Sequence, residues 1–145
     1  MKCPFCGAFL ENSLHKALGG VQTDPVISIT NVDYVLEVGN RIKAIIEEKR
    51  TYHHIAKTTQ LITLKKIAKS LNVPLLVVFV DDALEEVTVY DLPTSWKLPR
   101  TQLFNFERLD PVFVGDFSEF RDFILYNFVY YALPTSNGRR KGWRW

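Results

Sequence analysis

Residues 75–80 restrict the fold of this chain more than any other segment does. They read Leu-Leu-Val-Val-Phe-Val, follow Pro74 and end before Asp81. A strand with one face in water alternates apolar and polar side chains, whereas a strand covered on both faces is apolar throughout. We therefore expect residues 75–80 to form a central strand of a sheet that carries other elements on both faces.

Two β-rich segments precede this strand and indicate a hairpin. Residues 32–38 and 42–49 are rich in Val and Ile, and Gly39 and Asn40 separate them. Gly and Asn tolerate the positive φ angles that tight hairpin turns require. We expect further strands over residues 26–30 and 86–92.

Three segments carry helical signals. Residues 8–18 form a short helical pattern that two glycines end. Residues 55–71 have helical periodicity, and their apolar stripe consists of Leu61, Leu64, Ala68 and Leu71. A third helix begins after Asp116, where Glu119 completes a capping box, and it runs to about residue 133, before Pro134. Residues 93–114 show no regular pattern.

This order of elements predicts one α/β domain with helices flanking a central mixed sheet. The chain has 145 residues, of which 47% are hydrophobic and 23% charged, so it can form one buried core. We divide it into an N-terminus with two cysteines (1–7), a core (8–92), an extension with an aromatic helix (93–133) and a basic tail (134–145).

The chain shows no membrane or export signal. No apolar run approaches the roughly 20 residues that span a bilayer, and no signal peptide is recognisable at Met1. We expect an intracellular protein that does not contact membranes. The net charge of +2 does not by itself indicate nucleic acid, but basic residues cluster in segments 41–69 and 139–144.

The end of the second hairpin strand carries groups suited to phosphodiester hydrolysis. Side chains alternate along a strand, so Glu47 and Lys49 share one face and Glu48 points to the other. A carboxylate can bind Mg²⁺, and a lysine can orient the attacking water or stabilise developing charge. Asp33, on the preceding strand, is the candidate for a second carboxylate. The alternative is a solvated strand face, with Asp33 as a turn residue.

The order Val32-Asp33, hairpin, Glu47-Glu48-Lys49 resembles the PD-(D/E)XK nuclease motif, with valine in place of proline. The resemblance covers about residues 8–92 and is greatest to archaeal Holliday junction resolvases and RecB-like nuclease domains. It implies a restriction-endonuclease-like core, DNA cleavage and a Mg²⁺ or Mn²⁺ cofactor. The implied catalytic residues are Asp33, Glu47, Lys49 and Gln60. The implied metal ligands are Asp33, Glu47, the backbone carbonyl of Glu48 and Glu11.

This assignment requires Asp33 to lie on the same face of the hairpin as Glu47. A two-residue turn at Gly39 and Asn40 would pair Asp33 with Ile46 and place Asp33 on the face of Glu48. A three-residue loop or a β-bulge returns Asp33 to the face of Glu47. We therefore expect one of these irregularities.

The pair Cys3 and Cys6 resembles half of a zinc ribbon. A structural Zn²⁺ needs about four ligands, and the chain has only these 2 cysteines. His15, His53 and His54 could complete a site, or two chains could share one ion. A relic of such a site, a free dithiol and a disulfide are the alternatives. His53 and His54 also follow the catalytic strand, where a helix-start or surface role is the simpler interpretation.

Basic and aromatic residues suggest DNA and a second copy of the chain as partners. Lys57 and the tail residues Arg139, Arg140, Lys141, Trp143 and Arg144 combine charge and stacking groups suited to DNA. The aromatic helix over residues 117–131 has more apolar surface than one small sheet covers, which favours a homodimer. In the monomeric alternative, residues 93–114 cover that surface. Two other functions stay open: a non-catalytic nucleic-acid-binding module and a zinc-linked interaction domain.

Overall fold

The computed structural model describes residues 18, 30–98 and 103–130. By its internal contacts the chain divides into Met1–Asn31 and Val32–Trp145, and the second unit is described below. The helix predicted over residues 8–18 and the strand over 26–30 lie almost entirely outside the described residues. The tail from residue 131 onward lies outside them as well.

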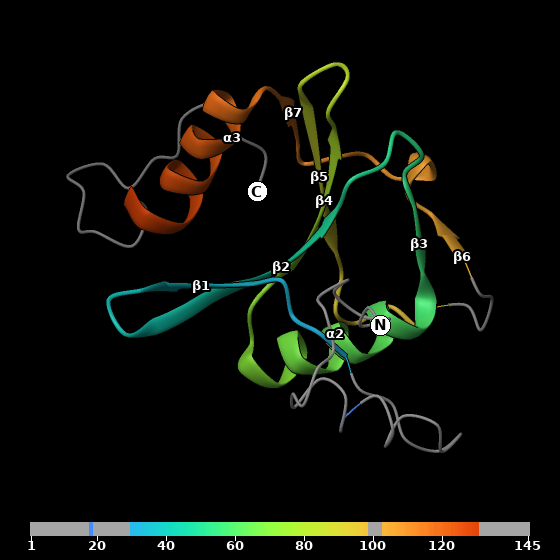
Figure 1. Ribbon diagram of the computed structural model, residues 1–145. Coiled ribbons are helices and arrows are strands. Elements are labelled where there is room, and N and C mark those ends of the chain that lie inside the picture. Colours follow the sequence, from blue (N-terminus) through green and yellow to red (C-terminus); the bar gives the residue numbers. More distant parts are fainter. Residues whose placement is uncertain (1–17, 19–29, 99–102, 131–145) are drawn as a thin grey trace. The chain divides into compact units, whose positions relative to one another are not determined.

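A mixed sheet forms the centre of this unit (Figure 1). Its order is β1-β2-β4-β5-β7, in which β2 and β4 run parallel and the other neighbours run antiparallel. The strands are β1 (Tyr34–Val38), β2 (Arg41–Lys49), β4 (Leu75–Asp81), β5 (Glu86–Leu92) and β7 (Phe113–Gly115). Every residue of β4 before Asp81 is buried. The predicted α/β architecture and the central apolar strand are thus confirmed.

The hairpin between β1 and β2 contains the expected irregularity. Gly39 and Asn40 have φ angles of 57° and 65°, which makes a tight two-residue turn. Glu37 pairs with Ile42, but Leu36 pairs with Ala44, so one extra residue is accommodated on β2. Beyond this bulge Tyr34 pairs with Ile46. The register therefore continues toward Asp33 opposite Glu47, as the predicted site required.

Helix α2 (Thr58–Leu71) packs on one face of the sheet. The helix was expected from residue 55, but β3 (Ile55–Lys57) pairs instead with β6 (Leu103–Asn105) in a separate two-stranded sheet. Leu61, Leu64 and Ala68 are buried as predicted. Leu71 is 42% exposed, because the helix ends there and Asn72 turns the chain away in a left-handed conformation.

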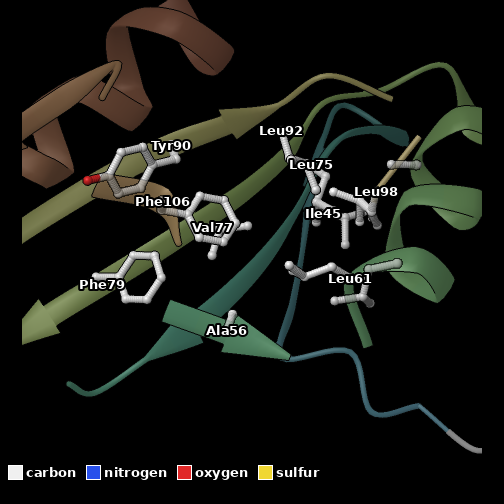
Figure 2. Close-up of a cluster of buried hydrophobic side chains, with 12 residues drawn as sticks. Ile45, Ala56, Leu61, Leu75, Val77, Phe79, Tyr90, Leu92, Leu98 and Phe106 are labelled. Atoms are coloured by element: carbon white, nitrogen blue, oxygen red, sulfur yellow. The ribbon is translucent and has the colours of Figure 1, made fainter. Parts of the chain in front are cut away.

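The α2 face of the sheet holds an aromatic and aliphatic core, which we call the α2-side cluster (Figure 2). Alternate residues of β4 point into it, and Leu61 and Leu64 of α2 cover them. Phe79, Tyr90 and Phe106 lie edge to face or tilted against one another, with ring centroids 5.3 to 5.8 Å apart. Such pairs add directional contacts to the burial of apolar area.

Helix α3 (Phe117–Ile124) packs on the other face through Phe123 and Phe120. The predicted capping box is present: the Glu119 N–H donates to Asp116 Oδ1 at 2.8 Å, and the Asp116 N–H donates to Glu119 Oε1 at 3.1 Å. A π-helical stretch, Leu125–Val129, continues the helix. The segment expected to be irregular contains β6, a 3₁₀ turn (Phe106–Arg108) and β7.

None of the helices that the structure describes is long and apolar enough to cross a membrane.

Candidate active site

Four predicted residues meet at the end of β2. Glu47 and Lys49 lie opposite Val77 and Phe79 of β4. Both of these β4 side chains belong to the α2-side cluster, so Glu47 and Lys49 point to that face. Gln60 approaches from the first turn of α2. Asp33 arrives just before β1, where the bulged register directs it toward Glu47.

Hydrogen bonds and an ion pair join Glu47, Lys49 and Gln60, and Asp33 is held by the backbone of Glu48. Lys49 Nζ lies 3.0 Å from Glu47 Oε1 and donates to Gln60 Oε1 at 2.8 Å. The backbone N–H of Glu48 donates to Asp33 Oδ2 at 2.9 Å. Because the backbone N–H and C=O of one strand residue point the same way, the Glu48 carbonyl also faces the side of Asp33. The sequence-predicted group is thus brought together.

Glu47 is the unusual member of this group. Its side chain is 2% exposed, and Oε2 is buried without a hydrogen-bond partner. Burial raises the pKa of Glu47 to about 7, against the opposing effect of Lys49. The negative charge of the nearby Asp33 raises that pKa further. A buried carboxyl next to a second carboxyl is unfavourable unless a proton or a cation stabilises it.

These residues fit a divalent cation of the Mg²⁺ type. Such an ion keeps several waters and commonly binds through one or two carboxylates. Asp33 and Glu47 supply two, and Glu47 Oε2 has no other partner among the described residues. The described part of the chain contains no group of three His, Cys, Asp or Glu side chains that could hold a metal ion. A site that requires three or more such side chains, as structural Zn²⁺ does, is therefore not found there.

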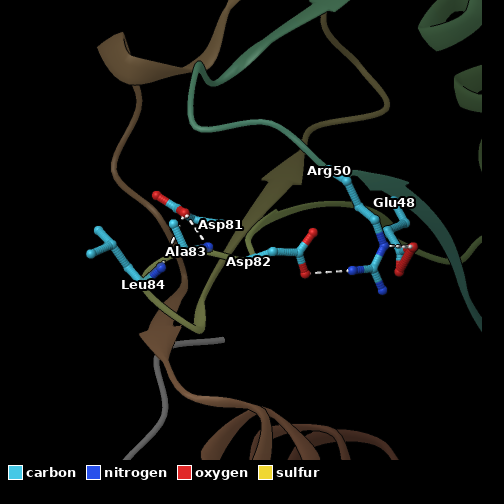
Figure 3. Close-up of polar contacts among 6 residues, drawn as sticks. All are labelled: Glu48, Arg50, Asp81, Asp82, Ala83 and Leu84. Carbon is cyan, nitrogen blue, oxygen red and sulfur yellow. Dashed lines mark hydrogen bonds and ion pairs between the residues drawn. The ribbon is translucent and has the colours of Figure 1, made fainter.

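The neighbouring residues Glu48 and Arg50 form a different arrangement (Figure 3). Arg50 Nη1 lies 2.6 Å from Asp82 Oδ1, and Arg50 Nε lies 3.3 Å from Glu48 Oε1. The Arg50 side chain is 55% exposed. This ion pair network was not predicted, because Asp82 is 32 residues from Arg50 and no local pattern connects them.

Lys57 is exposed at the start of α2, where it could meet a phosphate. Several other predicted site residues lie outside the described residues: Cys3, Cys6, Glu11, His15, Arg139, Arg140, Lys141, Trp143 and Arg144.

Of the two histidines after β2, His53 has the expected surface position, whereas His54 differs from the expected surface or helix-start role. His54 Nδ1 forms a 2.8 Å hydrogen bond with the Tyr90 hydroxyl, and its ring stacks on Phe79 at 4.7 Å. His53 is exposed, and its ring lies 3.9 Å from that of Tyr52. The sequence could not reveal the contact between His54 and Tyr90, because the two residues are 36 positions apart.

An apolar groove of about 390 Å³ lies on the opposite face of the sheet. It runs between β1 and α3, and its lining includes Tyr34, Val35, Ile46, Phe117 and Phe120. Glu48 is the one charged residue in that lining. Because Asp33, Glu47 and Lys49 do not line the groove, it is a separate feature from the candidate active site.

No protein-family model matches the chain, and no curated protein or solved structure matches it either.

Proposed function

We propose that this protein is a divalent-metal-dependent nuclease that hydrolyses phosphodiester bonds in DNA, with a restriction-endonuclease-like core. One observation carries the proposal: Glu47 is buried with an unsatisfied oxygen, next to Asp33 and within 3.0 Å of the Lys49 ammonium. A buried acid of this kind is unfavourable for stability, which suggests that it serves a function.

Asp33 and Glu47 are the proposed ligands of Mg²⁺ or Mn²⁺, together with the backbone carbonyl of Glu48. A divalent ion bound there supplies a more acidic water and neutralises charge on the phosphate. Glu11, also implied as a ligand by the resemblance, lies outside the described residues. The Asp33 carboxylate is close enough to that of Glu47 to raise its pKa.

Lys49 is proposed to act on the attacking water or on the charge that develops at the phosphate. Its ammonium is held between Glu47 and Gln60, at 3.0 and 2.8 Å, and its side chain is 25% exposed. The ammonium is therefore oriented by two partners yet still reachable by a substrate. Gln60 acts as a positioning residue, since it accepts one of the three N–H donors of Lys49.

We propose that the nuclease selects its substrate by the structure of the DNA, as the resemblance to Holliday junction resolvases implies. Lys57 and the basic tail with Trp143 are the proposed phosphate and base contacts. A homodimer would present two active sites to two symmetry-related strands.

The decisive experiment incubates the full chain with supercoiled plasmid, single-stranded DNA and a four-way junction, with Mg²⁺, Mn²⁺ or EDTA. We expect cleavage that needs the divalent ion. Lys49→Ala should remove cleavage while DNA binding is largely retained, because one lysine among many basic groups adds little to affinity. Lys66→Ala, which removes an exposed lysine from the middle of α2, is the matched control and should cleave normally.

Three outcomes would contradict the proposal or a part of it. DNA binding without cleavage under every ion condition would indicate a non-catalytic nucleic-acid-binding module. Normal cleavage by Lys49→Ala would exclude the role given to that lysine. Stoichiometric zinc in the purified protein, without nuclease activity, would favour an interaction domain built around Cys3 and Cys6.

A further inference from the structure

An exposed pair of aromatic rings follows the candidate active site directly. Tyr52 lies three residues after Lys49 and is 70% exposed. Its ring centroid is 3.9 Å from that of His53, and the two planes are inclined by 41°. The two rings contact each other, and Tyr52 is nevertheless largely exposed to solvent. We call Tyr52 and His53 the ring pair.

The loop that carries the ring pair is anchored on its C-terminal side. The His54 ring stacks on Phe79 with centroids 4.7 Å apart, and His54 Nδ1 is bonded to the Tyr90 hydroxyl at 2.8 Å. The backbone carbonyl of His54 accepts a 2.7 Å hydrogen bond from the Phe106 N–H. His54 is therefore fixed to the buried aromatic core shown in Figure 2, one residue after the ring pair.

The same loop is held on its N-terminal side. Arg50 bonds Asp82 at 2.6 Å and Glu48 at 3.3 Å, as Figure 3 shows. Within the loop, the His53 N–H donates to Thr51 Oγ1 at 3.1 Å. The ring pair is thus exposed on a loop that is fixed to the core at His54 and carries these surface contacts on its other side. An exposed ring on a constrained loop loses little conformational entropy when it binds a ligand.

The ring pair also lies close to the reacting groups. Three residues of extended chain span at most about 11 Å, which limits the separation of Tyr52 from Lys49 along the backbone. Packing in the sheet also keeps the ring pair near Lys49. Lys49 lies opposite Phe79, and His54, which follows the ring pair, stacks on Phe79. A DNA strand whose phosphate contacts Lys49 would therefore bring a nearby base within reach of Tyr52.

We propose that the ring pair stacks on an unpaired base of a DNA strand whose phosphodiester bond lies at the active site. This inference rests on the proposed nuclease function and specifies its substrate class. In a duplex the base faces are covered by neighbouring base pairs, so an aromatic ring from outside cannot stack on them. The protein would thus select single-stranded DNA, or a junction with unpaired nucleotides, over uniform duplex. Stacking of this kind accepts every base, so no sequence preference follows from it.

The test measures binding in EDTA, where no cleavage occurs. Two probes are compared. The first is a single-stranded oligonucleotide that contains 2-aminopurine, whose fluorescence falls on stacking, and the second is the same strand annealed to its complement. Tyr52→Ala should bind the single strand about ten-fold more weakly, with loss of the fluorescence change, and should bind the duplex as wild type does. Tyr52→Phe keeps the ring and should behave like wild type.

Trp96→Ala is the matched control, because Trp96 is also an exposed aromatic residue but lies in the loop after β5, outside both the candidate active site and the groove beside α3. It should bind both probes normally. The inference is overturned if Tyr52→Ala loses no affinity for the single strand, or loses the same factor on single strand and duplex.

A cleavage assay with Mg²⁺ on both probes separates this inference from the proposed function. If both proteins cleave DNA and Tyr52→Ala keeps the wild-type ratio of single-strand to duplex cleavage rates, the stacking role is excluded and the nuclease function is retained. Absence of cleavage by the wild-type chain, with Tyr52-dependent quenching retained, would remove the nuclease function and leave a single-strand-binding surface.

Discussion

The end of strand β2 and the residue after it carry two acid–base pairs with the same spacing, Glu47–Lys49 and Glu48–Arg50, which differ in burial and in their further partners. The Glu47 side chain is 2% exposed and that of Glu48 is 26% exposed. Glu47 keeps an unsatisfied oxygen, whereas Glu48 accepts from Arg50, which is also bound to Asp82. The difference arises from alternation along one strand, which sends adjacent glutamates to opposite sheet faces.

The two sheet faces explain this contrast. On the face of Glu47, α2 closes over the sheet and contributes Gln60 as a partner for Lys49. On the face of Glu48, α3 leaves a groove open beside β1, and water reaches the ion pair. A charge in water gains little from its partner, whereas a buried charge depends on its partners and on any bound cation. Burial, more than residue type, therefore distinguishes the candidate catalytic glutamate from its neighbour.

The largest predicted effect separates the two glutamates by activity. Asp33→Asn and Glu47→Gln each remove a charge from the proposed metal site, and cleavage should fall on the order of a thousand-fold. Glu48→Gln leaves its backbone carbonyl in place and should change cleavage only a few-fold. Initial rates of plasmid cleavage with saturating Mg²⁺ provide the measurement. Equal losses in Glu47→Gln and Glu48→Gln would break the comparison.

The second prediction concerns stability and pH in metal-free buffer. The pKa of Glu47 rises from 4.5 to about 7 on folding, because burial disfavours its charged form. The folded state therefore holds its proton more tightly than the unfolded state does. This contribution to stability is fully present below pH 4.5 and is lost as the pH rises through 7.

Glu47→Gln is uncharged at every pH and does not suffer this loss. The free energy of unfolding of Glu47→Gln, relative to wild type, should rise by about 2 kcal/mol between pH 5 and pH 8. Urea unfolding in EDTA at both pH values measures the difference, and the titrating groups that do not interact with Glu47 cancel. Glu48→Gln, the exposed counterpart, should show no such trend. A flat difference for Glu47→Gln would mean that the carboxylate is better solvated than the structure implies.

The third prediction uses the open groove on the face of Glu48. Phe117 lines it and is 47% exposed, and the aromatic side chains Tyr126 and Tyr130 are exposed further along the same segment. If a second copy covers this surface, light scattering at micromolar concentration should give twice the 16.8 kDa chain mass.

Phe117→Glu should restore the single-chain mass. An acidic residue in the first turn of α3 suits the helix dipole, so the variant should still fold. Leu84→Glu places the same charge at an exposed apolar position in the turn between β4 and β5 and should leave the mass unchanged. A wild-type mass near 16.8 kDa would exclude the homodimer and weaken the junction-cutting version of the function.

Local patterns in the sequence were sufficient for the features that local rules control. The parity of Glu47 and Lys49 follows from strand geometry, and the bulge follows from requiring Asp33 on the same face. The strand β3 was missed because Ile55 pairs with Asn105, and a pairing over so many residues leaves no local signal. Gln60 was expected from the family resemblance, but its 2.8 Å contact with Lys49 could be known only from the packing of α2.

The smallest predicted effect comes from the exposed pair. A hydrogen bond from Arg50 to Asp82 raises the pKa of the guanidinium above its ordinary value, which already lies far above neutrality. Its charge is therefore constant across the usable pH range and cannot produce the trend predicted for Glu47. Arg50→Gln removes an ion pair that water screens, so the thermal midpoint should stay within measurement error at 0.15 M salt. The ring pair should remain in place, because His54 keeps its contacts with Phe79 and Tyr90. A clear loss of stability in Arg50→Gln, suppressed by salt, would show that the two pairs of β2 are more alike than their burial indicates.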